Sequence, residues 1–266
     1  MEKEKIREYA LKLGADAVGF ASIDDYEHKG AVDPQDILPG VKSLVVSGYR
    51  EINGAVESAN HRTMMASRMA SMDFSLKNNY LLSRYIEDEF GVKAASVPVS
   101  YPLGMDLPSM GTVGDISLRH AAVAAGLGVF GRHNLVIHPR FGTRIVFTAV
   151  LTQLPLASDP RIEEELCTQC GLCVELCPAG ALDEEGKTHT FRCLKVSQPY
   201  GIGHAIRYIE RLFVASEEER KELLRDPMFL SLYQASFIGF QYACIKCMSV
   251  CPVGIKQDNE ETRVTD

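Results

Sequence analysis

Apolar and polar residues recur at helical spacing in two stretches of the N-terminal half. The first is residues 2–13, which Gly14 is placed to end. The second is residues 62–90, which contain no proline and are followed by Gly91, so they predict one long helix or two joined ones. Methionines at 64, 65, 69 and 72 line its first half, a pattern more typical of a pliable core face than of a cofactor site.

Short apolar runs bounded by turn residues predict the strands of a sheet. They lie at residues 17–21, 41–47, 94–100, 135–137 and 144–152. A Pro/Gly-rich loop fills residues 101–115, and a helix is expected from Ile116. Because helices and strands alternate without a doubly wound rhythm, the fold class is predicted as α+β, with a first domain at 1–156.

The most informative residues follow that domain. Seven of the eight cysteines fall into two runs, CTQCGLCVELCP (167–178) and CIKCMSVCP (244–252). The spacing of the first run, with its Cys-Pro ending, is the signature of a bacterial two-cluster ferredoxin. The second run has three cysteines, and the isolated Cys193 is the one remaining ligand for a second cluster.

Crossed ligation then assigns two [4Fe–4S] clusters, because the fourth cysteine of such a run ligates the other cluster. The first set is Cys167, Cys170, Cys173 and Cys251; the second is Cys177, Cys193, Cys244 and Cys247. Structural zinc is the competing interpretation, but four thiols in one short run exceed what a tetrahedral site needs. Disulfides suit such dense neighbours less well.

The remaining residues, 157–266, form the predicted second domain. It is a ferredoxin-like module with a helical insert at about 204–240, where Ser216 and Glu219 stand in capping-box register. The insert is expected either to cover the clusters or to help close a site against the first domain.

Charge and hydropathy narrow the possible partners and the cellular location. With 28 basic and 35 acidic side chains the net charge is −7, so a nucleic-acid partner is not expected. No apolar run reaches the roughly 20 residues of a membrane span, and the charged N-terminus does not read as a signal peptide. We therefore expect a cytoplasmic protein without a membrane partner.

The segment RHAAVAAGLGVFGRHNLVIHPRFGTRIVFTAVLTQLPL (119–156), followed by the two cysteine runs, resembles a known family. This is the family of cobalamin-dependent iron–sulfur reductases that includes epoxyqueuosine reductase and the reductive dehalogenases. The likeness extends from LGADAVGFA (13–21) to the last Cys-Pro.

The resemblance implies a nitroreductase-like α/β domain that holds cobalamin and a ferredoxin module that supplies its electrons. The implied cofactor-binding positions are Gly126, Gly128, Gly131, Arg132 and Gly142. Glycines permit close approach of the backbone to a flat ligand, but they also serve tight turns, and both interpretations stay open.

The sequence departs from epoxyqueuosine reductases at their proton donor. Where these carry an aspartate and a Glu-Arg pair, this chain has Thr112, Leu118 and Arg119. Asp115 and Tyr101 are the candidate catalytic proton donors, although for Asp115 the pattern favours the role of a helix N-cap residue. The C-terminal helical extension of longer members is missing too, which makes a tRNA substrate doubtful. Reductive dehalogenases, for their part, are usually exported, whereas a cytoplasmic protein is expected here.

These observations predict an oxidoreductase. A low-potential donor of the ferredoxin or flavodoxin class would reduce the clusters, and these would reduce cobalamin acting on a small organic substrate. Two alternatives remain open: an electron-transfer protein that reduces a corrinoid partner protein, and a flavin in place of cobalamin.

Overall fold

The computed structural model describes residues 1–27, 32–99, 103–104, 111–238 and 242–254. Their elements follow the order α1 (Glu2–Lys12), β1 (Ala17–Ser22), a 3-10 turn (Ile23–Asp25), α2 (Pro34–Ile37), β2 (Ser43–Arg50), α3 (Asn53–Val56), α4 (His61–Phe90), β3 (Ala94–Ser96), α5 (Leu118–Ala124), β4 (Val129–Phe130), β5 (Val136–Ile137) and β6 (Ile145–Thr152). The cysteine-rich part contains α6 (Leu172–Glu175), α7 (Thr190–Ser197), α8 (Ile202–Val214), α9 (Glu217–Leu223), α10 (Pro227–Ile238) and α11 (Lys246–Ser249).

The centre of the molecule is an antiparallel sheet of four described strands in the order β1-β2-β6-β3. Strands β2 and β6 pair over their whole length, with Val46 opposite Ala149. Every residue of β6 is buried, because helices cover both faces of the sheet. This arrangement confirms a mixed helix and strand fold.

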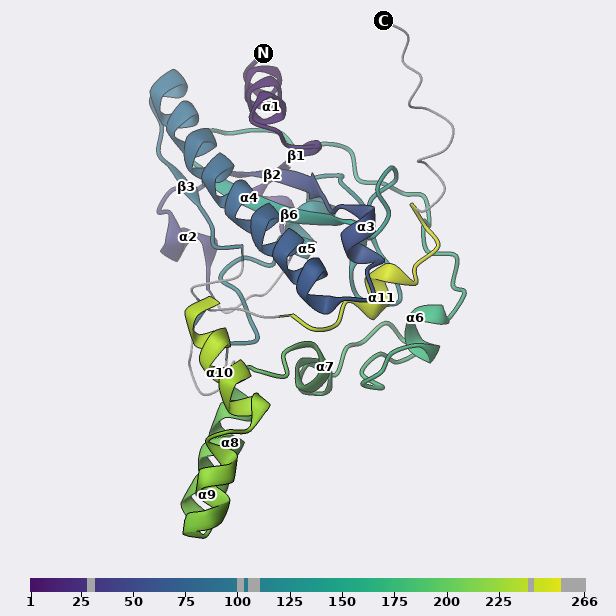
Figure 1. Ribbon diagram of the computed structural model, residues 1–266. Helices are drawn as coiled ribbons and strands as arrows, with labels where there is room; N and C mark the ends of the chain where they lie inside the picture. The colour runs from purple at the N-terminus through teal and green to yellow at the C-terminus, as the bar shows by residue number, and fades with distance from the viewer. Residues whose placement is uncertain (28–31, 100–102, 105–110, 239–241, 255–266) are drawn as a thin grey trace, which may run out of the picture.

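Two hydrophobic cores lie on the two faces of this sheet. On one face, α1 and α4 pack through side chains such as Ile6, Leu82 and Ile86. On the other face, the alanines of α5 pack against Leu44 and Ala149. Figure 1 shows α4 crossing the sheet as one continuous helix, with no break between its halves. Gly91 ends it in a left-handed conformation (φ 65°) that a glycine adopts without strain.

Several predicted boundaries differ from the observed ones. Strand β2 begins at Ser43 and not at 41, β3 ends at Ser96 and not at 100, and α5 begins at Leu118 and not at Ile116. The predicted strand at 135–137 corresponds to β5, but its hairpin partner β4 was missed, because a strand of two residues leaves no alternation to read.

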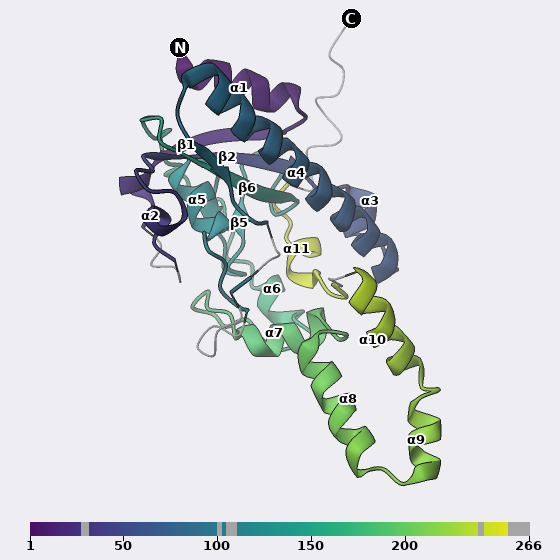
Figure 2. The ribbon, with the colours of Figure 1, turned by 90° about the vertical axis from the view of Figure 1, so that its left-hand side faces the viewer.

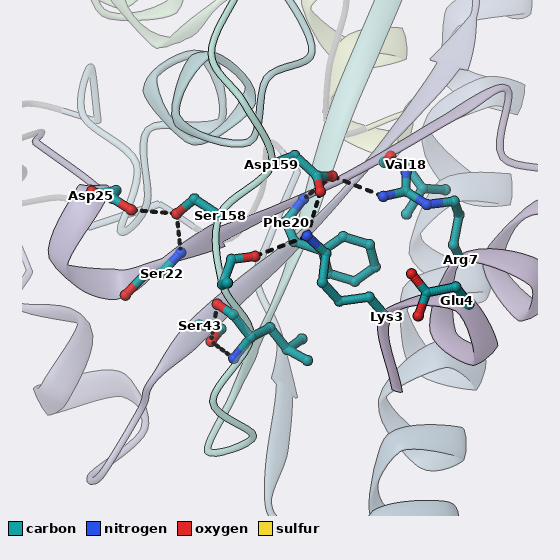
Figure 3. A network of polar contacts seen from close by, with 12 residues as sticks. Lys3, Glu4, Arg7, Val18, Phe20, Ser22, Asp25, Ser43, Ser158 and Asp159 are labelled. Carbon is teal, nitrogen blue, oxygen red and sulfur yellow. Dashed lines mark hydrogen bonds and ion pairs between the residues drawn. The ribbon is translucent and has the colours of Figure 1, made fainter. Parts of the chain in front are cut away.

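The segment after the sheet stays attached to it. Figure 3 shows Asp159 accepting hydrogen bonds from Lys3, from Arg7 and from the backbone N–H of Phe20. The Asp159 N–H in turn donates to the Phe20 carbonyl at 2.8 Å. Residues 157–161 therefore cover the free edge of β1, and they fix the start of the path toward the first cysteine run.

The helical insert is a separate arm. Its helices α8 and α9 point away from the sheet in both Figure 1 and Figure 2, so they do not cover the cysteine runs as one expectation had it. Tyr208 of α8 is buried, with its hydroxyl donating to the Leu223 carbonyl of α9, and it stacks on Phe229 of α10. The capping box of Ser216 and Glu219 is present as predicted at the start of α9.

Candidate metal centre

Four thiols from the two ends of the cysteine-rich region meet at one cavity. Cys167, Cys170 and Cys173 of the first run line it together with Cys251 of the second. The cavity has about 320 Å³ of empty space, counted to its open mouth. Burial raises the pKa of the Cys251 thiol, and charge repulsion from the three thiols of the first run raises it further.

The other four cysteines form a second group. Burial raises the pKa of Cys247 to about 12, and repulsion from Cys193, Cys244 and Cys177 adds to the rise. Burial likewise raises the pKa of Cys193, with Cys244 and Cys177 again contributing. The structure thus brings the eight thiols together in the same two sets that the crossed assignment predicts; that they ligate two clusters stays a prediction.

The backbone of the first run is bent so that its thiols can converge. Gln169 (φ 54°) and Gly171 (φ 77°) both take the left-handed conformation on either side of Cys170. For Gln169 this conformation is uncommon and costs energy. The result leaves Cys170 exposed while Cys173, on α6, is buried.

The isolated Cys193 reaches its group through α7. The N–H of His189 donates to the Ala181 carbonyl, which ties the start of this helix to the loop after Cys177. At its other end, the N–H of Ala243 donates to the Ser197 carbonyl at 2.7 Å, one residue before Cys244. The two ties place Cys193 between the two runs.

The second run is held by the first domain. The Thr143 hydroxyl donates to the Met248 carbonyl at 2.9 Å, and Arg144 reaches the Ser249 carbonyl at 3.5 Å. On the α4 side, the N–H of Tyr242 lies 3.2 Å from the sulfur of Met65. The methionine-rich half of α4 therefore packs against the second run, in line with the core interpretation.

Thiols in such groups suit an iron–sulfur cluster. Where burial and mutual repulsion raise thiol pKa values, as for Cys173 and Cys247, a bound cation is needed to hold the thiolates. Iron–sulfur clusters take four thiolates each, which is the number in each group. Within the described ranges, no three His, Cys, Asp or Glu side chains are placed to hold a single metal ion.

The predicted cofactor-binding glycines lie against the protein's own atoms. A Cβ on Gly126 would stand 2.3 Å from the Pro160 carbonyl oxygen, and one on Gly142 would stand 1.9 Å from that of Val253. Gly128 meets the Ile137 carbonyl oxygen in the same way, at 2.4 Å. These glycines make room where the first domain contacts itself or the cysteine-rich region, and their role toward a cofactor stays a prediction.

Arg132 and His133 stand at the cavity of the first thiol group. Both line it, together with Ile137 from the same β4–β5 hairpin. Arg132 was predicted as a cofactor-binding residue, and the structure places it beside the thiols. His133 was not predicted, since a lone histidine between an arginine and an asparagine carries no spacing signal.

Only one of the two candidate proton donors lies within the described residues. Asp115 is half-buried, two residues before Ser117, which is the N-cap residue of α5. The N-cap interpretation of Asp115 was therefore wrong, because the helix starts later than expected. Tyr101 lies outside the described residues.

The sequence analysis also missed a group of buried charged side chains beside the second cysteine run. Glu51 is buried and lies 3.1 Å from Arg68, and burial raises its pKa more than the arginine lowers it. The ion pair is not aligned as a hydrogen bond, so Glu51 Oε1 has no hydrogen-bond partner. Arg144, buried as well, binds Glu57 at 3.1 Å through one nitrogen while its other two nitrogens have no partner in the described chain.

Comparison with known proteins gives this site a context. The sequence profile of the 4Fe-4S binding domain matches residues 160–183, which contain the first cysteine run. The epoxyqueuosine reductase of Staphylococcus aureus (strain NCTC 8325 / PS 47) is 26% identical over 222 residues, which cover 72% of this chain and 55% of the relative. That of Bacillus subtilis (strain 168) is 24% identical over 285 residues, which cover 96% and 64%. The chain thus spans roughly half to two thirds of the length of these relatives.

Solved structures share the fold. An epoxyqueuosine reductase with an epoxyqueuosine-modified tRNA stem loop matches with a TM-score of 0.61 at 20% identity, over 95% of this chain and 65% of the other. A reductive dehalogenase whose structure suggests a mechanism for B12-dependent dehalogenation matches with a TM-score of 0.59 at 17% identity, over 89% and 36%. The relatives and neighbours belong to the reductase family that the sequence resembles, so that resemblance is confirmed.

The expectations about a nucleic-acid partner and about a membrane can be compared with these findings. A neighbour with this fold is solved with a tRNA stem loop, which runs against the general expectation that nucleic acid is no partner. Among the described helices, none combines the length and apolar character needed to cross a bilayer.

Proposed function

We propose that this chain is an iron–sulfur reductase related to the epoxyqueuosine reductases and reductive dehalogenases. Two [4Fe–4S] clusters would pass electrons to a cobalamin that reduces an organic substrate. The observation that carries the proposal is the meeting of eight thiols in two groups of four, drawn from two runs and one isolated cysteine. A carrier protein alone would need no sheet domain of this size.

The two groups suggest an order of electron flow. Cys170 in the first group is the one exposed thiol, whereas Cys247 in the second is strongly desolvated. Electrons from a ferredoxin or flavodoxin would therefore enter at the first cluster and leave through the second. Such a low-potential donor, and the oxygen sensitivity of the clusters, fit a cytoplasmic setting.

The proposal that cobalamin is the cofactor rests more on the comparisons with known proteins than on contacts in the structure. The B12-dependent dehalogenase neighbour shares the fold, and a nitroreductase-like first domain would offer the same platform. The cavity at the first thiol group is lined by four cysteines, and a cluster would occupy it. When bound, cobalamin would supply the low-potential chemistry at the substrate, and this chain would orient the substrate and supply a proton, for which Asp115 and Tyr101 are the candidates.

The relatives indicate only in part which class of substrate this chain would reduce. A modified tRNA stem loop is the first substrate to test, because a neighbour is solved with one. Against it stand the net charge of −7 and the residues Thr112 and Leu118, where epoxyqueuosine reductases carry acids. A small organic molecule is the class that we favour.

The proposal is tested by anaerobic reconstitution with iron and sulfide, followed by titration with cobalamin. We expect about eight irons per chain and a change in the corrinoid spectrum on binding. Eight irons without corrinoid binding would leave an electron-transfer protein that serves a partner, and a yellow, fluorescent cofactor released on denaturation would indicate a flavin. Adding a tRNA stem loop to the same sample tests the nucleic-acid alternative directly.

Paired substitutions test the two ligand sets. Cys173→Ala and Cys193→Ala should each lose about four irons, and the double variant should lose nearly all, because each residue belongs to a different group. Iron content and electron paramagnetic resonance of the reduced protein provide the measurement. A Cys193→Ala protein that keeps about eight irons would contradict the assignment.

A further inference from the structure

One buried nitrogen in the wall of the first cavity has no partner. The side chain of His133 is 4% exposed, and its Nε2 makes no hydrogen bond to any residue that the structure describes. The residue lines the same cavity as Cys167, Cys170, Cys173 and Cys251. A buried polar atom without a partner costs stability, so such an atom at a cavity wall points to a ligand atom inside.

The other ring nitrogen fixes which form of the imidazole is present. The backbone N–H of Leu135 donates to His133 Nδ1 at 3.1 Å, so Nδ1 acts as an acceptor and carries no hydrogen. In the neutral ring the hydrogen then sits on Nε2, which becomes a donor. Burial lowers the pKa of His133 to about 4, which agrees with a neutral ring.

The ring is held in place on both sides. His133 lies in the turn of the β4–β5 hairpin, which is closed by hydrogen bonds from Gly131 N–H to the Leu135 carbonyl and from Asn134 N–H to the Gly131 carbonyl. Gly131 makes room for the imidazole, since a Cβ there would stand 2.5 Å from the ring carbon Cε1. The glycine at this position and the histidine two residues later therefore form one packed unit.

We propose that His133 Nε2–H donates a hydrogen bond to a sulfur of the cluster held by Cys167, Cys170, Cys173 and Cys251, and that this bond raises the reduction potential of that cluster. The inference rests on the proposed function, because it requires a cluster in this cavity. The sulfur atoms of an iron–sulfur cluster carry negative charge that increases on reduction, so a donor aimed at them stabilises the reduced state. The hydrogen bond would thus make the cluster with the exposed Cys170 easier for an external donor to reduce than the same cluster without it.

Two substitutions separate the donor from the rest of the ring. In His133→Asn the side-chain oxygen can replace Nδ1 as the acceptor for Leu135, but no donor reaches the position of Nε2. In His133→Gln the amide nitrogen reaches that position and can restore the donor. We expect the potential of the first cluster to fall in His133→Asn, with a tenfold shift in the reduction equilibrium, or about 59 mV for one electron, and to recover in His133→Gln.

The measurement is a redox titration followed by electron paramagnetic resonance on the reconstituted full-length protein. Iron content comes first: a variant with about eight irons retains the clusters, so a failure of the cluster proposal itself is visible separately. The second cluster serves as the internal control, and its potential should not move. An unchanged potential in His133→Asn, or equal shifts in both variants, would overturn the inference.

A second readout can be taken on the native protein. In protein labelled with ¹⁵N-histidine, the reduced first cluster should show magnetic coupling to a histidine nitrogen and to an exchangeable proton. Both couplings should be absent from His133→Asn. If the native protein lacks them, His133 donates to something other than the cluster and the inference is wrong.

Discussion

Gly142 shows how much a single residue position controls at this site. Its φ of +56° lies in the left-handed region, and a Cβ would come within 1.9 Å of the Val253 carbonyl oxygen, two residues after Cys251. The turn before β6 and the end of the second cysteine run therefore touch with no space for a side chain. The position of Cys251 depends on that contact.

We expect Gly142→Ala to weaken the first thiol group. The substitution adds left-handed strain of about 1 kcal/mol and a backbone clash that separates the two segments. Gly91→Ala is the matched control, since Gly91 has a similar φ of +65° but no atom within 4 Å of its Cβ position. Urea unfolding should show a small loss of stability in both variants. Under chelation, we expect faster iron loss from Gly142→Ala alone. Equal rates of iron loss in the two variants would contradict the role of the contact.

At the residue scale, sequence reasoning found positions but not partners. The spacing of the cysteines predicted two sets of four thiols, which lie in two groups in the structure, while their role as cluster ligands stays a prediction. The glycines from 126 to 142 were predicted as cofactor-binding positions or turn residues, and their contacts with Pro160 and Val253 were not foreseen because these neighbours are distant in sequence. The buried pair of Glu51 and Arg68 gave no signal, since burial of a charge is decided by the tertiary structure.

Among the elements, the segment 157–161 links the sheet to the cysteine-rich region. Asp159 is the centre of its attachment, because it pairs with both Lys3 and Arg7 of α1 and lies 19% exposed. Burial alone would raise the pKa of Asp159, but the hydrogen bonds from Lys3 and Arg7 outweigh it and lower the pKa. The ionised carboxylate is therefore the form that stabilises the fold.

Asp159→Asn should reduce the free energy of unfolding at pH 7 by about 1 kcal/mol. A carboxyl group with a lowered pKa stabilises the folded state above its unfolded-state pKa, and the effect is lost as the pH falls through the folded value. The difference between variant and parent should thus shrink below about pH 4. Glu89→Gln, which breaks the exposed pair with Lys5, is the control and should change little. Urea unfolding across this pH range is the measurement, and a pH-independent difference would disprove the ionic origin.

The long elements were predicted most closely, whereas the bounds of short ones such as β3 were misplaced and β4 was missed. Helix α4 and strand β6 have enough residues for periodicity and burial to register in the sequence. The β4–β5 hairpin has two residues in each strand and is set by the tight turn that holds His133. The start of α5 was misplaced because Asp115 and Ser117 are both good N-cap residues, and only the structure distinguishes them.

The whole molecule consists of a sheet domain with two cores and a cysteine-rich region that has few buried apolar side chains. Stability in the second region would then depend on bound clusters, as in other small metal-binding domains. The arm of α8 and α9 lies away from the thiols and should be independent of them (Figure 2).

Removal of iron with a chelator under anaerobic conditions should open the cysteine-rich region and leave the sheet folded. Trypsin should cut faster after Arg192 and Lys195 on α7, because this helix carries Cys193 and hydrogen bonds tie its two ends to segments next to the cysteine runs. Sites on the arm, such as Arg211 and Arg220, are the control and should be cut at the same rate with and without iron. Mass spectrometry of the fragments gives the rates, and unchanged cleavage on α7 would show that the region folds without clusters.

The assembly of the molecule was predicted in outline. The cysteine pattern and the length of chain upstream predicted a first domain that is supplied with electrons by a ferredoxin-type module, and the 4Fe-4S profile over residues 160–183 agrees with the iron–sulfur part of that outline. The direction of the arm could not be read from the sequence, because the capping box of α9 and the packing of Tyr208 on Phe229 lie within the arm itself and do not depend on where the arm points.

The interleaving of the thiol groups also dictates when they can form. Cys173 needs Cys251 to complete its group, and Cys177 needs Cys244 and Cys247, so each group draws on the second run. During synthesis, neither group can be completed until the ribosome has passed the second run. A premature stop before Cys244 would therefore remove members of both groups at once.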